Sequence, residues 1–520
     1  MPVLNWIGKE QVVNHDKDVP FRLLRKIKTL SMESSQNLII HGDNLEALKS
    51  LMPYYGGKIK CIYIDPPYNT GNEDWVYNDK VNSPKIKKWL GKVVGGESED
   101  LCRHDKWLCM MYPRLKLLRE LLKENGTIFL SIDENEINYL KLLMDEIFGS
   151  ENFIAQLVWK KKAGGGSDAK YFAIDHEYVL VYAKNEKAQE RYFAGLTEKL
   201  KLDYKYKDDN YKVLGSYKRK NLHQLGIDTD RPNLKYPIVC PDGSKILPPT
   251  IWRWSEDTLL KAKKEGKIDF IKSKNGEWQV FTKMYLYDTS GEEYKIKPRS
   301  LLLDVGMTRD GNSELKELFD DKAVFDYPKP SKLINFLLGI ITSKDDFILD
   351  SFAGTGTTGH AVMQLNKEDG GNRKFILIEM EDKIAKEVTA ERIRRAIKKY
   401  HYSECFEFCE LDKPLFNEEG KIDEECTFEQ LAQYVYFTET QMNLDKTHIN
   451  GNFISNFNEI DYYLIFKERG KNVLNKSFLK TIRKNDAKRV IYADKCLLDE
   501  ETLDKYNIQF KQIPYEVRIY

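Results

Sequence analysis

The 520-residue sequence has no long hydrophobic run, few cysteines and almost no net charge. No stretch approaches the roughly 20 uncharged apolar residues of a membrane-spanning helix. The start, MPVLNWIGKEQ, lacks the basic-then-apolar pattern of an export signal. We therefore expect no membrane partner and a cytoplasmic location. The hydrophobic fraction of 41% is sufficient for large cores, and the length predicts two to four domains.

The eight cysteines are spread along the whole chain, unlike the dense spacing of a disulfide-stapled secreted domain. We expect them to be reduced thiols. Cys405 and Cys409 are the closest pair, and no second cysteine pair or nearby histidine pair completes a zinc site. The sequence therefore predicts no metal.

The net charge of +1 hides an uneven distribution of charge along the chain. Residues 195–300 carry 22 Lys and Arg against 15 Asp and Glu, whereas residues 401–520 carry 16 against 22. A basic segment is what a phosphate-contacting surface requires, and an acidic segment is repelled by DNA. This pattern favours a nucleic-acid partner for the first segment and a protein partner for the second.

Short apolar strands alternate with amphipathic helices on both sides of the basic segment. NLIIHGD, NLEALKSL and KCIYID predict strand, helix and strand over residues 37–65. LLKENGTIFLSID predicts a helix that ends at Gly126 and a strand that ends at Asp133, and HEYVLVYAK predicts another strand. The alternation resumes at about Asp345. There DDFILDSFAGTGTTGHAVMQL predicts a strand, a glycine turn and a helix, RKFILIEME predicts a second strand, and IAKEVTAERIRRAI predicts a second helix.

Two further regions differ in character from these α/β segments. Residues 191–300 contain many tyrosines and lysines, Pro-Asp-Gly and Pro-Pro turns and short alternating runs, which predict an inserted, mostly β module. Beyond a charged linker at residues 410–426, a small separate α/β domain is predicted by DYYLIFKER, SFLKTIRKND, KRVIYAD, EETLDKY and IQFKQIPYEV, as strand, helix, strand, helix and strand.

The first motif with chemical meaning is the glycine turn DSFAGTGTTG at residues 350–359, between a buried strand and a helix. Gly354 and Gly356 let the backbone pass close to a ligand. The free N–H groups at the helix start, near Thr357 and Thr358, favour a carboxylate or phosphate. In an open parallel sheet, cofactors bind in the crevice beyond such strand ends.

The same glycines also form G-x-G-x-x-G, with Glu379 twenty residues beyond Gly359, which is the spacing of a dinucleotide site. An NAD-dependent oxidoreductase is therefore an alternative. A dinucleotide turn has a glycine directly after the strand, however, and here the three residues 351–353 intervene.

The second motif is Asp65-Pro66-Pro67-Tyr68 at the end of the strand KCIYI. Two prolines fix an extended backbone without N–H groups, so we expect the Asp65 carboxylate and the adjacent carbonyls to face outward as acceptors only. An exocyclic amino group donates two hydrogen bonds to such acceptors, and Tyr68 offers a face for stacking a planar base. Hydrogen bonds that draw the amine toward tetrahedral geometry make it a better nucleophile.

Together, IDPPYNTG and LDSFAGTGTTG resemble the amino-methyltransferases of the β class, in which the catalytic motif precedes the cofactor motif. More closely, the chain is similar to the modification subunit of type III restriction-modification systems. This resemblance runs to about residue 400, and at lower similarity to the C-terminus, through LNWIGKE, IDPPYNTGNEDWVYND, GTIFLSIDENE, HEYVLVYAK and FDYPKPSKLI.

The resemblance implies a fold, a reaction and partners. We expect a Rossmann-like class I methyltransferase sheet, circularly permuted, with an inserted mostly β target-recognition domain and a small C-terminal α/β domain. The implied reaction transfers a methyl group from S-adenosylmethionine to N6 of an adenine flipped out of duplex DNA. The implied protein partners are a second copy of this chain and a helicase-nuclease restriction subunit.

The resemblance also implies the roles of individual residues. Asp65, Pro66, Pro67 and Tyr68 would hold the target amine and base. Asp43 of HGDN is expected near the cofactor's adenine, because its strand should end beside those that carry Asp65 and Asp350. The other expected cofactor contacts are Asp65, Lys329 (by analogy only), Asp350, Phe352, Ala353, Gly354, Gly356, Thr357, Thr358 and Glu379. His176-Glu177-Tyr178 resembles a further family segment and equally fits a strand start with a surface histidine.

Several alternatives stay open. Asp-Pro-Pro-Tyr usually accompanies adenine, whereas cytosine-N4 enzymes more often carry Ser-Pro-Pro; an RNA methyltransferase and a non-catalytic DNA-binding subunit are further alternatives. Methylation of cytosine at carbon 5 needs a cysteine, typically after a proline, and the sequence has no Pro-Cys pair. In the insert, the expected DNA contacts are Lys212, Lys218, Arg219 and Lys220.

The expected domains follow from these assignments. They are an N-terminal arm (1–30), the catalytic half of the methyltransferase domain (31–190), the target-recognition insert (191–300), the cofactor-binding half (301–400) and the C-terminal α/β domain (401–520).

Overall fold

The computed structural model describes residues 4–33, 35–70, 84–96, 101–164, 169–224, 231–415, 422, 426–440, 442–467 and 471–513. Three predicted features lie outside the described residues. They are the segment NEDWVYND of the resemblance, the end of the last predicted strand and most of the predicted linker after residue 415. The chain divides into two compact units, Met1–Arg191 with Arg299–Tyr520, and Tyr192–Pro298.

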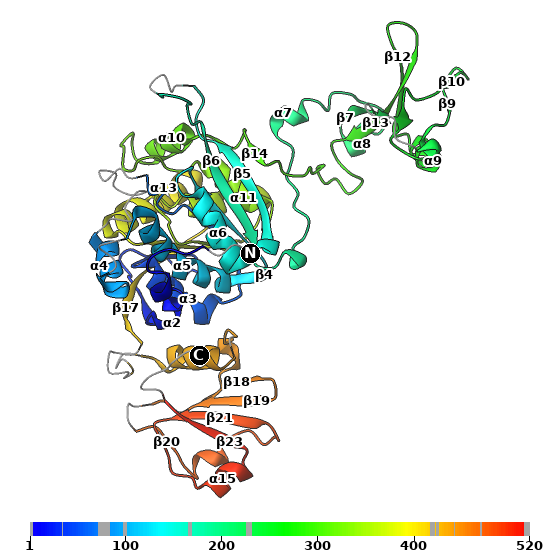
Figure 1. The fold of residues 1–520 in the computed structure, drawn as a ribbon. Coiled ribbons are helices and arrows are strands. Elements are labelled where there is room, and N and C mark those ends of the chain that lie inside the picture. The colour runs from blue at the N-terminus through cyan, green and yellow to red at the C-terminus, as the bar shows by residue number, and fades with distance from the viewer. Residues whose placement is uncertain are drawn as a thin grey trace. The chain divides into compact units, whose positions relative to one another are not determined.

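Among the described residues, a ten-stranded sheet forms the centre of the first unit (Figure 1). The strands from β17 to β4 are parallel to one another, whereas β6 is antiparallel to both β4 and β5. In spatial order the strands are β1 (Arg22–Lys26), β17 (Glu407–Pro414), β2 (Leu38–His41), β16 (Lys374–Glu379), β15 (Phe347–Asp350), β3 (Ile59–Ile64), β4 (Leu122–Ile132), β6 (His176–Ala183), β5 (Phe153–Lys160) and β14 (Leu301–Leu302). This confirms the expected α/β class and the rearranged order of the sheet.

The strand order brings together two segments that are far apart in the sequence. β15, which precedes the glycine turn, pairs in parallel with β3, which precedes Asp65. The carboxyl ends of parallel strands lie at one edge of a sheet, and this edge is where α/β proteins bind their ligands. Both motifs therefore start from the same edge.

Helices pack on both faces of the sheet, as the alternation of side chains in β16 shows. Ile376 and Ile378 belong to the core shared with α3 (Asn44–Tyr55), α5 (Arg103–Leu121) and α6 (Ile137–Phe148). Phe375 and Leu377 contact α12 (Thr357–Asp369) on the other face, where a Cβ on Gly359 would lie 2.9 Å from Leu377. The unit's other helices before residue 401 are α1 (Lys9–Val12), α2 (His15–Asp18), α4 (Pro84–Val93), α10 (Thr308–Leu318), α11 (Ser331–Gly339) and α13 (Ala390–Tyr400).

Two predicted helices have different bounds in the structure. The helix predicted to end at Gly126 ends at Leu121, because the chain already pairs with β3 at Leu122. The register then shifts before Thr127, so the residues up to Gly126 form a bulge within β4. The helix predicted by IAKEVTAERIRRAI begins as a π-helix at Ile384–Thr389 and continues as α13.

The two ends of the chain also differ from expectation. The N-terminal segment is part of the fold, since β1 pairs with β17 and Trp6 is buried in the main core. β17, expected in the C-terminal domain, belongs to the main sheet because it pairs in parallel with β2. Residues 410–414 of the expected linker therefore form strand in the main sheet, and the start of the C-terminal domain stays a prediction.

The C-terminal part has its own four-stranded sheet beyond β17. Where a helix was predicted over residues 477–486, the structure has only the 3₁₀ turn Phe478–Lys480. The elements here are α14 (Phe428–Thr440), β18 (Phe453–Phe457), β19 (Ile460–Leu464), β20 (Val473–Leu474), β21 (Lys488–Ala493), β22 (Lys495–Cys496), α15 (Glu500–Lys505) and β23 (Ile508–Gln512). Other 3₁₀ turns of this unit are Ser150–Asn152, Glu186–Ala188 and Lys446–His448.

The second unit, Tyr192–Pro298, has the mostly β character that its sequence predicts. Its central sheet consists of β7 (Tyr217–Asn221), β13 (Trp278–Tyr285) and β12 (Ile268–Lys272), all antiparallel. A small core of Leu222, Tyr236, Ile238, Trp252, Leu259 and Val280 supports it. The remaining elements are α7 (Glu198–Lys201), α8 (Tyr211–Leu214), β8 (His223–Gln224), a 3₁₀ turn (Pro232–Leu234), β9 (Ile238–Val239), β10 (Lys245–Ile246), β11 (Ile251–Trp252) and α9 (Glu256–Lys264).

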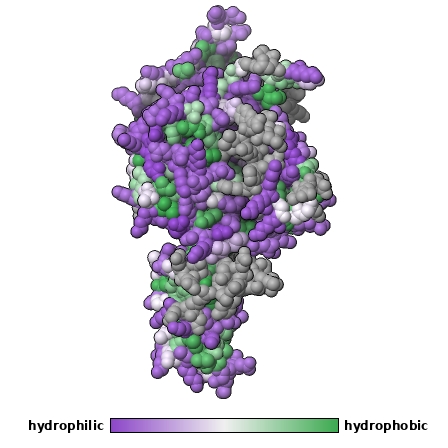
Figure 2. All heavy atoms as spheres, turned by 90° about the vertical axis from the view of Figure 1, so that its left-hand side faces the viewer, coloured by the Kyte–Doolittle hydropathy of each residue, from purple (hydrophilic) through white to green (hydrophobic). Residues whose placement is uncertain are grey.

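The surface is largely hydrophilic in the view of Figure 2, where hydrophobic side chains gather only in small separate patches. Within the residues that the structure describes, none of the helices is both long enough and apolar enough to cross a bilayer.

Candidate active site

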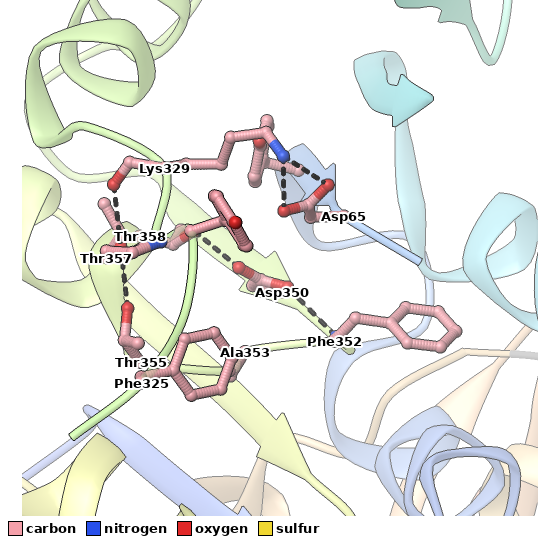
Figure 3. Close-up of a pocket in the computed structure, with 13 residues that line it drawn as sticks. Asp65, Phe325, Lys329, Asp350, Phe352, Ala353, Thr355, Thr357 and Thr358 are labelled. Carbon is pink, nitrogen blue, oxygen red and sulfur yellow. Dashed lines mark hydrogen bonds and ion pairs between the residues drawn. The ribbon is translucent and has the colours of Figure 1, made fainter. Parts of the chain in front are cut away.

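A pocket lies at the carboxyl ends of β3 and β15 (Figure 3). Its empty volume is about 360 Å³, including solvent at the mouth. The lining residues are Tyr63, Asp65, Phe325, Tyr327, Pro328, Lys329, Asp350, Phe352, Ala353, Gly354, Thr355, Thr357 and Thr358. The pocket therefore joins the residue after β3 to the glycine turn after β15, as their shared sheet edge requires.

The glycine turn is fastened at both ends by Asp350. Its carboxylate accepts a hydrogen bond from the Phe352 N–H at 3.0 Å and one from the Thr358 hydroxyl at 2.5 Å. Gly356 has a φ of +77° and precedes the first residue of α12, a conformation that glycine adopts without strain. The first N–H groups of α12 have no partner within the helix, so this pocket wall is suited to a carboxylate.

Glu379, at the end of β16, binds the backbone of the glycine turn. Its side chain accepts hydrogen bonds from the N–H groups of Gly354 and Glu381, both at 2.9 Å, and it is only 2% exposed. Burial raises the pKa of Glu379 to about 8. Glu379 is not among the pocket-lining residues, because the glycine turn covers its carboxylate.

The Asp-Pro-Pro-Tyr segment is anchored by neighbouring helices. The indole N–H of Trp107, in α5, donates to the Pro67 carbonyl at 2.7 Å. This carbonyl therefore does not face outward as the sequence predicted, because α5 binds it. After Tyr68, Asn69 adopts a φ of +57°, and its amide donates to the buried Glu136 and to the Arg103 carbonyl. These bonds fix the direction in which Asp65 enters the pocket.

A cluster of charged side chains surrounds Asp65. The ammonium of Lys329, in the loop before α11, lies 2.9 and 2.8 Å from the two Asp65 oxygens and 2.8 Å from the Tyr68 hydroxyl (Figure 3 shows the Asp65 contacts). That hydroxyl lies 2.8 Å from Asp65 and 3.0 Å from Glu177. Glu177 Oε2 is also 3.3 Å from Lys329, and its other oxygen is 3.3 Å from Lys161. Two carboxylates and two ammonium groups thus balance in charge.

Burial and pairing shift the pKa values of this cluster in opposite directions. Burial raises the pKa of Asp65, although Lys329 opposes the rise. For Glu177, burial is outweighed by Lys329 and Lys161, which lower its pKa. The Lys329 pKa is raised because Asp65 and Glu177 together outweigh the effect of burial. Burial raises the pKa of Asp350 to about 7.

A comparison with known proteins gives this pocket a context. Residues 59–391, which include both motifs, match the family model described as DNA methylase, of the N6/N4 methyltransferases. The chain belongs to this DNA methylase family.

Named relatives of this methylase include two modification subunits and one type II enzyme. The chain is 35% identical to the type III restriction-modification enzyme StyLTI Mod subunit of Salmonella typhimurium. This alignment of 370 residues covers 69% of the chain and 55% of the relative. The chain is 33% identical over 457 residues to the EcoPI Mod subunit of Escherichia phage P1, covering 76% and 68%. It is 34% identical over 383 residues to the type II methyltransferase M.KpnI of Klebsiella pneumoniae, covering 69% and 85%. The chain thus spans between about half and two thirds of the two Mod subunits.

Not all the residues that the sequence singled out line the methylase pocket. Asp43 caps α3, where its carboxylate accepts from the N–H groups of Leu45 and Glu46 at 2.9 and 3.2 Å. The next residue, Asn44, donates to the Ser351 carbonyl at 3.0 Å, which ties the end of β2 to the glycine turn. Asp43 therefore lies beside the turn but outside the pocket lining, as do Pro66, Pro67, Tyr68 and Gly356.

Tyr68 itself is placed differently from a stacking platform. Its ring is only 6% exposed, and the Lys329 ammonium lies 4.9 Å from the ring centroid. The ammonium also lies 2.8 Å from the Tyr68 hydroxyl, so the ring is buried beside Lys329 and does not present an open face to a base.

Sequence reasoning left the roles of Glu177 and Arg392 unassigned. Glu177 lies at the start of β6, and because β6 is antiparallel to β4, its first residues lie at the same sheet edge as Asp65. The order of the sheet was the signal for this placement. Arg392, in α13, is fully buried, and its guanidinium donates to the Thr355 and Thr357 hydroxyls at 2.7 Å each. It places a positive charge behind the glycine turn.

The expected DNA contacts lie in the second unit, on α8 and β7. Arg219 is engaged internally, because its guanidinium pairs with Asp269 at 2.6 Å and lies 3.7 Å from the Tyr206 ring centroid. Lys218 and Lys220 share the opposite face of β7 from Arg219, since side chains alternate along a strand. Lys220 is exposed, and so is Lys212 in α8.

One group of potential metal ligands consists of His41 at the end of β2, Asp382 just after β16 and Glu410 within β17. Lys386 already contacts both carboxylates there, at 2.6 and 3.1 Å. An ammonium that satisfies both acids argues for an ion-pair network in place of a metal centre.

Proposed function

We propose that this methylase transfers the methyl group of S-adenosylmethionine to N6 of an adenine that has been extruded from duplex DNA. One observation carries the proposal: the Asp65 carboxylate, an acceptor suited to an amine, lines the same pocket as the glycine turn and helix start. A nucleophilic amine and a methyl donor held at these two walls meet within one cavity. A G-x-G-x-x-G dinucleotide site would leave Asp65 without a role.

The pocket residues fit the cofactor. The helix start at Thr357 and the buried Arg392 behind it suit the carboxylate of a methionine group, while Asp350 suits a cationic group. Bound here, the cofactor supplies an electrophilic methyl group on a sulfonium. We assign its methionine part to Asp350, Phe352, Ala353, Gly354, Gly356, Thr357 and Thr358, its ribose to Glu379 and its adenine to the neighbourhood of Asp43.

The chain's own catalytic work is positioning and electrostatics. Asp65 accepts a hydrogen bond from the target amine and orients the nitrogen lone pair toward the methyl group. When the C–N bond forms and the carbon–sulfur bond of the sulfonium breaks, with its electron pair left on sulfur, the Asp65 carboxylate would stabilise the positive charge on nitrogen. One amine proton would then leave toward this carboxylate or solvent. The anchoring of Pro67 by Trp107 keeps Asp65 in place during this step.

The choice of adenine rests on the acidic residue at position 65. A carboxylate is a stronger acceptor for an amine than the serine hydroxyl that cytosine-N4 enzymes more often carry. The matched family covers both amines, so cytosine N4 is the alternative product. Nucleoside analysis of the methylated DNA distinguishes them directly.

The second unit and the C-terminal part supply the proposed partners. Lys212, Lys218 and Lys220 of the basic insert would contact DNA phosphates, whereas Arg219 is held by Asp269 and serves the fold. Because two of the relatives are named as Mod subunits of type III restriction-modification enzymes, we infer a restriction subunit as a partner of this chain. We further propose a second copy of this chain as a partner. Sedimentation of the full chain, alone and with such a subunit, tests this.

The most informative experiment is methylation-sensitive sequencing of DNA from cells that express this chain alone. We expect N6-methyladenine at one short sequence motif, and its absence in cells that express the Asp65→Ala variant. Unmodified DNA, or a signal that persists unchanged in the variant, would overturn the proposal.

A further inference from the structure

Lys329 occupies the position in front of Asp65 that the target amine needs. Its ammonium makes nearly equal contacts, 2.9 and 2.8 Å, with the two Asp65 oxygens and a third contact with the Tyr68 hydroxyl. An ammonium has three N–H donors, and this geometry directs two of them at the carboxylate that the proposed substrate also uses. The base amine and Lys329 therefore compete for one carboxylate.

Lys329 is too deeply buried to leave this site for solvent. Its side chain is only 7% exposed, between Asp65, Tyr68 and the ring of Trp159, whose centroid lies 5.7 Å away. Moving a buried ammonium away from every counter-charge costs several kcal/mol. Any displacement from Asp65 therefore requires a second carboxylate within reach.

Glu177 is such a carboxylate. Its Oε2 is 3.3 Å from the Lys329 ammonium, only slightly farther than the Asp65 oxygens, and its side chain is 11% exposed. It also accepts from Tyr68, so a small rotation of the lysine toward Glu177 keeps the same hydroxyl as a neighbour. The ammonium thus has two adjacent buried positions, one on each acid.

We infer that Glu177 is a positioning residue that takes the Lys329 ammonium from Asp65 when the target amine binds. This inference rests on the proposed function, and it deepens it by explaining how a carboxylate already paired with lysine becomes available. With Lys329 moved to Glu177, Asp65 keeps its full negative charge beside the amine. As the methyl carbon leaves sulfur and bonds to nitrogen, that charge stabilises the developing cation, which then releases one amine proton.

The test is a double-mutant cycle between Glu177→Gln and Lys329→Met, read as the single-turnover rate of methyl transfer at saturating cofactor and DNA. Glutamine keeps the shape of Glu177 but removes its charge, so Lys329 stays on Asp65. We expect the rate to fall ~10-fold or more, because a buried charge 3.3 Å away has been lost. In the Lys329→Met background, no ammonium competes for Asp65, so Glu177→Gln is expected to leave the rate unchanged or to raise it.

A second readout follows the target base before chemistry. With 2-aminopurine at the target position, fluorescence reports how much of the base is extruded, and Glu177→Gln is expected to lower that fraction only when Lys329 is present. Asp175→Asn is the matched control, since it removes a nearby carboxylate whose side chain is 46% exposed and 4.0 Å from Lys162. It is expected to leave both readouts unchanged.

Equal rate losses for Glu177→Gln in both backgrounds, or no loss in either, would overturn the inference while wild-type activity upholds the proposed function. Absence of methyl transfer by the wild-type chain would overturn both. If Glu177→Gln lowers the melting temperature strongly, Glu177→Asp provides the same test. The aspartate side chain is shorter by one methylene, so its carboxylate lies farther from Lys329. Restoration of the rate by Lys329→Met in that background is the expected result.

Discussion

We predict that Asp350 makes the affinity for S-adenosylmethionine depend on pH. Burial raises the pKa of Asp350 to about 7, even though the Phe352 N–H and the Thr358 hydroxyl both donate to its carboxylate. Below that pH the Asp350 carboxyl is mostly protonated. A cationic ligand favours the ionised form, so cofactor binding releases a proton from Asp350 and tightens as pH rises.

The magnitude follows from the ionised fraction of Asp350. With a pKa of about 7, that fraction rises from ~3% near pH 5.5 to ~50% near pH 7, so the affinity constant is expected to rise by up to ~15-fold. The cofactor's own α-amino group stays protonated over most of this range, since such groups titrate near pH 8. Asp350→Asn keeps the shape of the side chain without a titration, and its affinity should vary far less with pH.

Isothermal titration calorimetry of S-adenosylmethionine, in two buffers of different ionisation enthalpy, measures both the affinity and the protons released. The same pH slope in wild type and Asp350→Asn would refute the reasoning, because the titration would then belong to another group. Glu379, whose pKa is raised to about 8, is the natural next candidate in that case.

Three other substitutions test how the pocket is held in place. Gly359→Ala puts a methyl group 2.9 Å from two packed side chains and should lower the free energy of unfolding by ~1–3 kcal/mol, measured by denaturant titration; an unchanged midpoint would contradict this. Trp107→Phe removes the hydrogen bond to the Pro67 carbonyl. The activation free energy from the single-turnover rate should rise by more than the ~0.5–1.5 kcal/mol lost from the free energy of unfolding, and a rate at the wild-type level would show that the anchor is not needed. Arg392→Met removes the cation behind Thr355 and should weaken cofactor binding by ~10-fold in calorimetry, whereas equal affinity would exclude an electrostatic role.

The positions of Asp65 and Asp350 could be predicted because Asp65 directly follows a buried strand and Asp350 is the last residue of another. Once the two strands are taken as parallel members of one sheet, their carboxyl ends must share an edge, and local sequence is sufficient for that inference. The match of Gly354 and Gly356 to a cofactor turn is likewise local. The end of the helix before Gly126 was not predictable in this way, because pairing with β3 at Leu122 decides it.

The charge cluster around Asp65 depends on contacts that no local pattern encodes. Lys329 and Asp65 are separated by 264 residues, and only the path of the loop before α11 brings them together. Glu177 looked like part of a strand start, since a carboxylate next to a histidine is ordinary at such a position. Its burial became apparent only when the antiparallel β6 was placed beside β4.

The proposed methyl transfer depends most directly on Asp65, whose carboxylate must hold the target amine beside the methyl donor. The decisive measurement is transfer of isotopically labelled methyl from S-adenosylmethionine to duplex DNA by the purified chain, followed by nucleoside analysis, for wild type and Asp65→Ala. We predict labelled N6-methyldeoxyadenosine from the wild type and none from the variant, with cofactor affinity reduced less than activity. Labelled N6-methyldeoxyadenosine at the wild-type rate from Asp65→Ala would contradict the account.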